Sequence, residues 1–158
     1  MPGEIDRVHA TAIALGGRAA LIRGASGSGK SDLAFRCLGL GLSAVVHDKV
    51  MLVSDDQVLL RREGAFLRAS APPQLLGKLE VRGIGILEVE AVTEANVVLI
   101  ADLVQEGPIE RFPDPWPCAH IMGVEIPQLR LRAFESSSPL KLVAAIQTAP
   151  QPRVGPKP

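Results

Sequence analysis

Short apolar runs, separated by turn residues, recur along the chain and predict a domain built mainly from strands. The clearest is Asn96–Ala101, whose apolar run is typical of a strand buried on both faces. Gly16-Gly17 and the sequence Arg61–Gly64 separate neighbouring runs and predict turns. The remaining runs predict strands at residues 5–14, 19–22, 44–46, 50–53, 58–60, 65–68, 79–82 and 86–89.

Only two segments carry clear helix signals. One covers residues 30–38, directly after a glycine-rich turn. The other covers residues 139–148, with Ser138 as its expected N-cap and Pro139 in the first helical position, where no bond from its nitrogen is needed. The pattern therefore predicts a single α/β domain over residues 1–149, with a mixed, strand-rich sheet and few helices. The proline-rich tail over residues 150–158 is expected to be disordered.

The glycine-rich turn matches the phosphate-binding pattern G-x-x-x-x-G-K-[ST] at every fixed position. Its glycines let backbone N–H groups surround a polyphosphate, and the following helix directs its N-terminus at the phosphates. Lys30 can reach the terminal phosphates of ATP, and the hydroxyl of Ser31 can hold Mg²⁺. A glycine- and serine-rich turn that matches by accident is the alternative. The octet reads Gly24-Ala25-Ser26-Gly27-Ser28-Gly29-Lys30-Ser31.

Composition and charge limit the classes of function. The 158 residues are about one domain, and a hydrophobic content of 47% is enough to build one core. Lys+Arg and Asp+Glu are both 17, which argues against binding nucleic acid or a membrane through a basic field. The sequence has no signal-peptide pattern and no run long enough to span a bilayer, so we expect a cytoplasmic protein. Cys37 and Cys118 belong to no C-x-x-C pair, and Cys37 is expected to be a small buried residue.

Two adjacent acids, Asp55 and Asp56, follow the apolar run at residues 50–53. A carboxylate at hydrogen-bond distance can accept the proton that a serine hydroxyl loses as it attacks a phosphate. Alternation along a strand directs the two acids to opposite faces, so only one of them can face a substrate. The residues alone leave open which one, and a turn or Mg²⁺ binding is the alternative. His9 is a lone histidine on a predicted strand, where a core residue is more common than a catalyst.

Four features taken together resemble one known family. The first is His9, which lies fifteen residues before Gly24. The second is the phosphate-binding octet, which begins at Gly24. The segment Leu52–Asp56 (LVSDD) is similar to the family's LVADD segment, and Leu79–Leu87 (LEVRGIGIL) is similar to its signature LEIRGxGII. From Val8 to Ile146, the chain resembles the catalytic domain of bacterial HPr kinase/phosphorylase, in a short form without the family's N-terminal domain.

The resemblance implies a protein-serine kinase that uses ATP and Mg²⁺ to phosphorylate an HPr-type phosphocarrier protein of the phosphotransferase system. It assigns Asp56 as the base in the forward reaction and the acid in the reverse one, and His9 as an active-site partner. It makes Glu80 the second Mg²⁺ ligand beside Ser31, and Arg111 a group that stabilises charge on the transferred phosphate. A solvated strand carboxylate and a solvated loop cation are the alternatives for Glu80 and Arg111. The family also assembles into hexamers, which is the expected oligomer here.

The chain departs from the family in three places. The family's stretch for dephosphorylation reads PVxPGR, and in Pro127–Arg132 a leucine replaces its glycine and Arg130 its second proline. Leucine does not provide the backbone freedom of glycine, so the kinase direction is better supported than the phosphorylase direction. The connection between Lys30 and Asp56 is longer than in the family, with the extra residues expected around Leu40–Lys49. Ala10 follows the histidine where glycine is common.

Two other functions remain possible from the sequence. A small-molecule P-loop kinase would use Asp102, after the apolar run, as its acid on the Mg²⁺ side, but it would also need an arginine-rich helical lid that we do not find. A nucleotide-binding regulatory module without catalysis is the other. The presence of Lys30, Ser31, Asp56 and Glu80 argues against it, and ATP binding without turnover would favour it.

Overall fold

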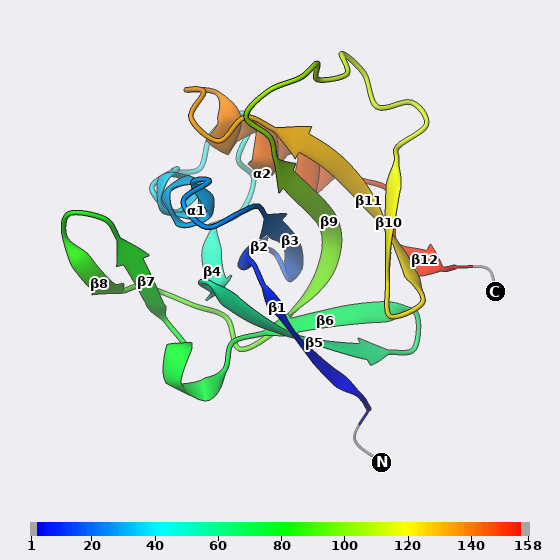
Figure 1. The fold of residues 1–158 in the computed structure, drawn as a ribbon, viewed down its shortest axis with the longest axis horizontal. Coiled ribbons are helices and arrows are strands. Elements are labelled where there is room, and N and C mark those ends of the chain that lie inside the picture. Colours follow the sequence, from blue (N-terminus) through cyan, green and yellow to red (C-terminus); the bar gives the residue numbers. More distant parts are fainter. Residues whose placement is uncertain (1–2, 156–158) are drawn as a thin grey trace.

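The computed structural model describes residues 3–155 and confirms the predicted α/β class, with many strands and few helices (Figure 1). The first helix has the predicted bounds, and most predicted strands are present with shifted ends. In chain order, the elements of the described residues are β1 (Ile5–His9), β2 (Thr11–Leu15), β3 (Arg18–Arg23), α1 (Lys30–Leu38), β4 (Met51–Ser54), β5 (Gln57–Glu63), β6 (Phe66–Ser70), the 3-10 helix η1 (Pro73–Leu75), β7 (Lys78–Val81), β8 (Gly85–Glu88), β9 (Ala95–Leu103), β10 (Cys118–Ile121), β11 (Val124–Leu131), α2 (Ser138–Thr148) and β12 (Arg153–Val154).

One mixed sheet organises the domain. Within the described residues it has ten strands, with the main order β1-β5-β6-β9-β3-β2-β4 and with β11, β10 and β12 continuing from β9. Strands β3, β9 and β11 are parallel neighbours, and β4 runs in the same direction because β2 is antiparallel to both β3 and β4. The carboxyl ends of all four strands therefore meet at one edge, where α/β sheets place their ligands.

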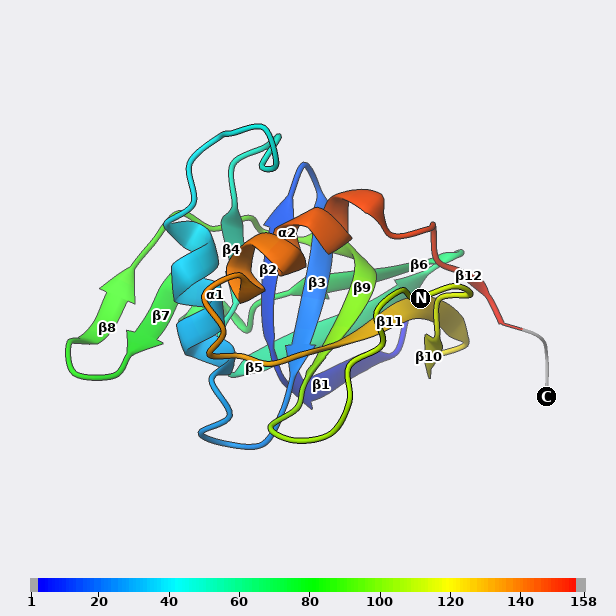
Figure 2. The same ribbon diagram turned by 90° about the horizontal axis from the view of Figure 1, so that it is seen from above.

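The sheet is covered on both faces. Figure 2 shows α2 lying over β2 and β3, with α1 beside it toward β7, and the apolar residues of both helices form one core cluster with that face. Strands β5 and β6 turn across the opposite face, where Leu60 and Leu67 belong to a second cluster with Leu21 of β3. Residues of β2 are buried along the whole strand because both faces are covered. Arg18 ties α2 to the sheet by donating to the carbonyl oxygens of Ile146 and Ala149 at the helix C-terminus.

The predicted first strand over residues 5–14 is interrupted at Ala10. Strand β1 pairs with β5, whereas β2 pairs with β3 and β4, so the chain changes partners between His9 and Thr11. The N–H of Ala10 donates to the carbonyl oxygen of Asp56 (3.1 Å) at this junction. Ala10 is fully buried, and a small side chain suits this close crossing. The single-strand prediction was wrong because the change of partner depends on β5, far away in sequence.

Three further local predictions were wrong. Residues 44–46 form no strand, because the Ser43 hydroxyl accepts the N–H groups of Val45 and Val46 in a turn. Ser138 is not the N-cap of α2: the helix includes it, and its hydroxyl donates to the carbonyl oxygen of Arg132. The tail differs from the disordered segment expected, since β12 pairs with β11; residues 156–158 lie outside the described residues.

The two cysteines occupy opposite environments, which leads to a testable difference in reactivity. Cys37 is fully buried on α1, and burial raises the pKa of its thiol to about 12, while Cys118 is exposed. Because the thiolate is the reactive form, we expect iodoacetamide at pH 8 to label Cys118 quickly and Cys37 only after denaturation. Intact-mass spectrometry counts the labels, and Cys118→Ser should leave the native protein unlabelled. Fast labelling of native Cys118→Ser would contradict the placement of Cys37 in the core.

No helix among the described residues has both the length and the apolar character required to cross a membrane.

Candidate active site

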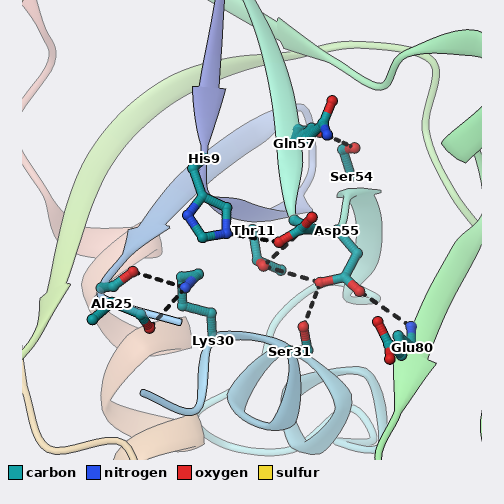
Figure 3. Close-up of polar contacts among 11 residues, drawn as sticks. His9, Thr11, Ala25, Lys30, Ser31, Ser54, Asp55, Gln57 and Glu80 are labelled. Atoms are coloured by element: carbon teal, nitrogen blue, oxygen red, sulfur yellow. Dashed lines mark hydrogen bonds and ion pairs between the residues drawn. The ribbon is translucent and has the colours of Figure 1, made fainter. Parts of the chain in front are cut away.

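The phosphate-binding octet forms the turn between β3 and the N-terminus of α1. Gly27 and Gly29 have φ of 78° and 100°, a backbone region that favours glycine. The buried Lys30 folds back across the turn, and its Nζ donates to the carbonyl oxygens of Gly24 (2.7 Å) and Ala25 (3.0 Å) (Figure 3). The lysine charge is thus held at the centre of the turn, next to the N–H groups of the first helical turn.

Close packing explains two of the glycines. A Cβ added to Gly24 would collide with the side chain of Ser28, whose hydroxyl is buried and has no hydrogen-bond partner within the described residues. A Cβ added to Gly29 would lie 2.8 Å from Cζ of Phe134 and 3.0 Å from Cβ of Ala133. The octet is therefore shaped both by its own turn and by the connection that follows β11.

Asp55 is the residue that links the octet to the rest of the site. It follows β4, is buried, and its Oδ1 accepts the hydroxyls of Ser31 (2.6 Å) and Thr11 (3.0 Å). Its Oδ2 accepts the backbone N–H of Glu80 (3.1 Å) (Figure 3). Sequence reasoning did not assign Asp55 to a specific role. The available signal was its place after an apolar strand in a chain with a phosphate-binding octet, since P-loop proteins use such an acid together with the octet serine.

Asp56 turns the other way and is exposed. Its backbone has φ of 66°, and its Oδ1 lies 2.7 Å from Nε2 of His9. The side chains of His9 and Asp56 are 50% and 62% exposed, so both remain accessible to another molecule. Their contact follows from the register of β1 with β5, which places His9 opposite Gln57, the residue after Asp56. The structure thus brings together two residues that the resemblance to the family placed in one active site.

The residues expected to hold Mg²⁺ also lie together. Glu80 belongs to β7, and Figure 3 shows its carboxylate on the same side as Asp55 and Ser31. A hydroxyl and two carboxylates are hard oxygen donors that suit Mg²⁺, which usually keeps several waters and also binds substrate phosphates. Residues 3–155 contain no cluster of three or more acidic, histidine or cysteine side chains that would form a complete protein cage for a metal. The donor set therefore fits a metal ion that is shared with a nucleotide.

Arg111 does not join this arrangement. It is exposed in the connection between β9 and β10, and its side chain has no hydrogen bond or ion pair with any residue of the described part of the chain. The stretch from Pro127 to Leu131, matched to the family's dephosphorylation segment, belongs to β11, and Leu131 is buried opposite Leu103 of β9. A regular buried strand position needs no glycine, which is consistent with leucine there.

The carboxylate of Asp102 forms hydrogen bonds with Arg23 and Gln128 and not with the octet. The guanidinium of Arg23 donates to both of its carboxylate oxygens (2.8 and 3.0 Å), and the amide of Gln128 donates to one of them. The hydrogen bond that Arg23 donates to Asp102 raises the pKa of Arg23 above its usual value. Because Ser31 is bonded to Asp55 instead, the arrangement disfavours Asp102 as the acid on the Mg²⁺ side.

The three bonds to Asp55 predict that it matters for stability as well as for the site. Asp55→Asn keeps the shape but replaces one acceptor oxygen with an N–H₂ donor, which cannot satisfy all three partners. We expect the free energy of unfolding to fall by about 1–3 kcal/mol. Urea unfolding measures this, with Asp6→Asn on the exposed strand β1 as a matched control expected to change it by less than about 0.5 kcal/mol. Equal losses in both variants would contradict the assignment.

A strand, a glycine-rich turn and a helix, with a strand-terminal acid bonded to the serine of the turn, define the class of P-loop nucleotide-binding domains. Comparison with known families is more specific. The description "HPr Serine kinase C-terminal domain" matches residues 3–151, and the chain belongs to this family.

Curated relatives and a solved structure agree with this result. The HPr kinase/phosphorylase of Cupriavidus necator is 30% identical over 148 residues, which covers 87% of this chain and 43% of the relative. That of Clostridium botulinum is 37% identical over 93 residues, covering 59% of this chain and 28% of the relative. The chain thus spans less than half the length of these relatives. The Hpr(Ser) kinase/phosphatase structure from Coxiella burnetii is similar in fold, with a TM-score of 0.75, 24% identity and coverage of 90% of this chain and 94% of that one.

Proposed function

We propose that this domain is a protein-serine kinase that uses ATP and Mg²⁺ to phosphorylate an HPr-type phosphocarrier protein. The observation that supports this best is the exposed pair of His9 and Asp56 next to the buried pair of Ser31 and Asp55. One pair suits the phosphates and a metal ion, and the other is open to a hydroxyl group on a large partner. The membership in the HPr Serine kinase C-terminal domain family supports the choice of acceptor.

Binding of the phosphates falls to the octet and its neighbours. The N–H groups of Gly27, Gly29 and the start of α1 suit the phosphate oxygens, and Lys30 would exchange its two carbonyl partners for them. Ser31, Asp55 and Glu80 would hold Mg²⁺, which neutralises charge on the phosphates when bound. These contacts position the nucleotide, which is the main contribution a protein makes to phosphoryl transfer.

Proton transfer falls to Asp56. Its carboxylate would accept the proton of the attacking serine hydroxyl, and in the reverse direction the acid so formed would return it. His9 holds one carboxylate oxygen of Asp56 at 2.7 Å, which orients the group and leaves its other oxygen for the substrate. The exposure of both side chains suits a serine on a folded protein, because such a residue cannot enter a closed pocket.

Other parts of the proposal rest on the resemblance to the family. Arg111 would approach the transferred group only when its exposed connection, residues 104–117, is folded over the site by the bound partner. The reverse, phosphorylase reaction is proposed as a secondary activity, since the family's glycine and second proline are absent from Pro127–Arg132. A cytoplasmic location and assembly into a hexamer are proposed on the same grounds.

The proposal is tested by incubating the chain with Mg²⁺, radiolabelled ATP and a purified HPr-type carrier. A carrier labelled on serine is the expected result, and a carrier with that serine changed to alanine is the control. ATP binding without any label on the carrier would overturn the proposed kinase activity and favour a nucleotide-binding module without catalysis. Adding inorganic phosphate to the phosphorylated carrier without ATP then tests the reverse reaction.

A further inference from the structure

A hollow of about 390 Å³ lies beside the phosphate-binding octet, on the side away from Asp55. It is lined mostly by apolar atoms, and its volume is within the range of about 300–1,000 Å³ typical of small-molecule sites. Its walls come from Ser28 of the octet, from residues 103–105 at the end of β9, and from residues 132–135 after β11. The proposed roles of the octet, the Mg²⁺ ligands and Asp56 leave this hollow unused.

Phe134 is the aromatic residue of the hollow, and its ring is unusually placed. The side chain lies against the octet, where its Cζ is the atom that a Cβ on Gly29 would meet at 2.8 Å. Even so, the residue is 70% exposed, so the octet covers only part of it. An exposed aromatic face beside a phosphate-binding turn offers a surface on which a flat, aromatic group can stack.

The backbone on both sides of Phe134 is held in place. The guanidinium of Arg36 on α1 donates to the carbonyl oxygen of Ala133 and to that of Glu135 (3.3 Å). The hydroxyl of Ser138 donates to the carbonyl oxygen of Arg132, one residue further back. A backbone held in this way loses little conformational freedom when a ligand covers the ring, which favours binding.

The topology places the hollow where the rest of a nucleotide would extend. Across the sheet, the order β4-β2-β3-β9-β11 puts the octet after β3, the acids Asp55 and Asp56 after β4 on one side, and the hollow after β9 and β11 on the other. Phosphates that lie on the octet with their transferred end toward Asp56 have their nucleoside end toward Phe134. We infer that the hollow binds the nucleoside of the nucleotide, with its base stacked on the ring of Phe134. This inference rests on the proposed function in requiring a nucleotide on the octet.

The hollow offers stacking more than hydrogen-bond recognition of the base. Arg132 is already engaged, since its Nη2 donates to the carbonyl oxygen of Gly107 (2.6 Å) and its Nε pairs with Glu135 (3.6 Å). Stacking is tolerant of base identity because each base has an aromatic face. The ring of Phe134 should therefore contribute to the affinity for a nucleotide and not to the affinity for a bare polyphosphate.

The test compares two ligands that share phosphates and differ in the nucleoside. Isothermal titration calorimetry with Mg²⁺ would measure binding of ADP and of tripolyphosphate to the wild type, Phe134→Ala and Phe134→Trp. We expect Phe134→Ala to weaken ADP binding by about 5- to 100-fold, the usual effect of removing one stacked ring, and to leave tripolyphosphate binding unchanged. Phe134→Trp should restore ADP binding because it keeps an aromatic face.

The matched control is Phe66→Ala, which removes a half-exposed ring on β6 away from the hollow and should affect neither ligand. Unchanged ADP binding in Phe134→Ala, or equal losses for ADP and tripolyphosphate, would overturn the inference, since Phe134 would then be at most a support for the octet. Absence of ADP binding to the wild type would overturn the proposed function as well. If the wild type does not label the carrier but Phe134→Ala still weakens ADP binding, only the proposed kinase activity is overturned.

Discussion

Asp56→Asn is expected to lower the rate of phosphoryl transfer by about 10²- to 10⁴-fold, the usual contribution of a general base. Asparagine keeps the size of the side chain and tolerates the left-handed backbone at this position, where φ is 66°. It loses the ability to accept the proton of the serine hydroxyl. The contacts of Lys30, Ser31 and Asp55 are untouched, so ATP affinity should stay close to that of the wild type.

The measurement separates these two effects. Single-turnover transfer of label from ATP to the carrier gives the chemical rate, and calorimetry gives the affinity for ATP and Mg²⁺. Asp6→Asn, on exposed β1, is the control and should leave both unchanged. A transfer rate in Asp56→Asn equal to that of the wild type would remove Asp56 from the role of base. A loss of ATP affinity instead would move it to the metal or phosphate contacts.

Replacing Lys30 should have the second large effect, on nucleotide binding. Lys30→Met keeps most of the apolar stem and removes the charge. Each hydrogen bond to a charged group that is lost in this way costs about 1.5–3 kcal/mol of binding free energy. The affinity for ATP should therefore fall by at least about tenfold and up to about 150-fold for one such bond. Transfer to the carrier should fall with it, because the phosphates are no longer held.

Lys30 also holds the turn itself, through the carbonyl oxygens of Gly24 and Ala25, so stability must be measured in the same variant. Urea unfolding at several ATP concentrations distinguishes the roles: Lys30→Met should need at least about tenfold more ATP than the wild type for the same stabilisation. Lys141→Met, an exposed lysine on α2, is the matched control and should retain stabilisation by ATP. Full retention of ATP binding by Lys30→Met would contradict the assignment of the octet as a phosphate site.

Local sequence was sufficient where the structure depends on neighbouring residues. The helix Lys30–Leu38 has the predicted bounds because the glycines of the octet and the helix-forming residues after it determine the turn and the helix together. The buried strand β9 was predicted from its apolar run, since a strand covered on both faces needs no polar side. The mixed α/β class follows from the same local patterns.

Long-range pairing decided the features that the sequence left open. The residues alone left Asp55 and Asp56 equivalent, because their different contacts depend on β7, which supplies a donor to Asp55, and on the pairing of β1 with β5, which brings His9 to Asp56. The break at Ala10 and the pairing of β12 with β11 likewise join residues distant in the chain.

The sequence by itself determined which residues can bind phosphate, hold a metal ion or transfer a proton. These properties belong to the side chains and to the fixed spacing of the octet. Only the tertiary structure decided which of them meet, and it also placed Asp55 against Ser31 and Phe134 against the octet. The physical reason is that the carboxyl ends of β3, β4, β9 and β11 converge at one edge of the sheet, and strand order is set by pairing and packing across the whole domain.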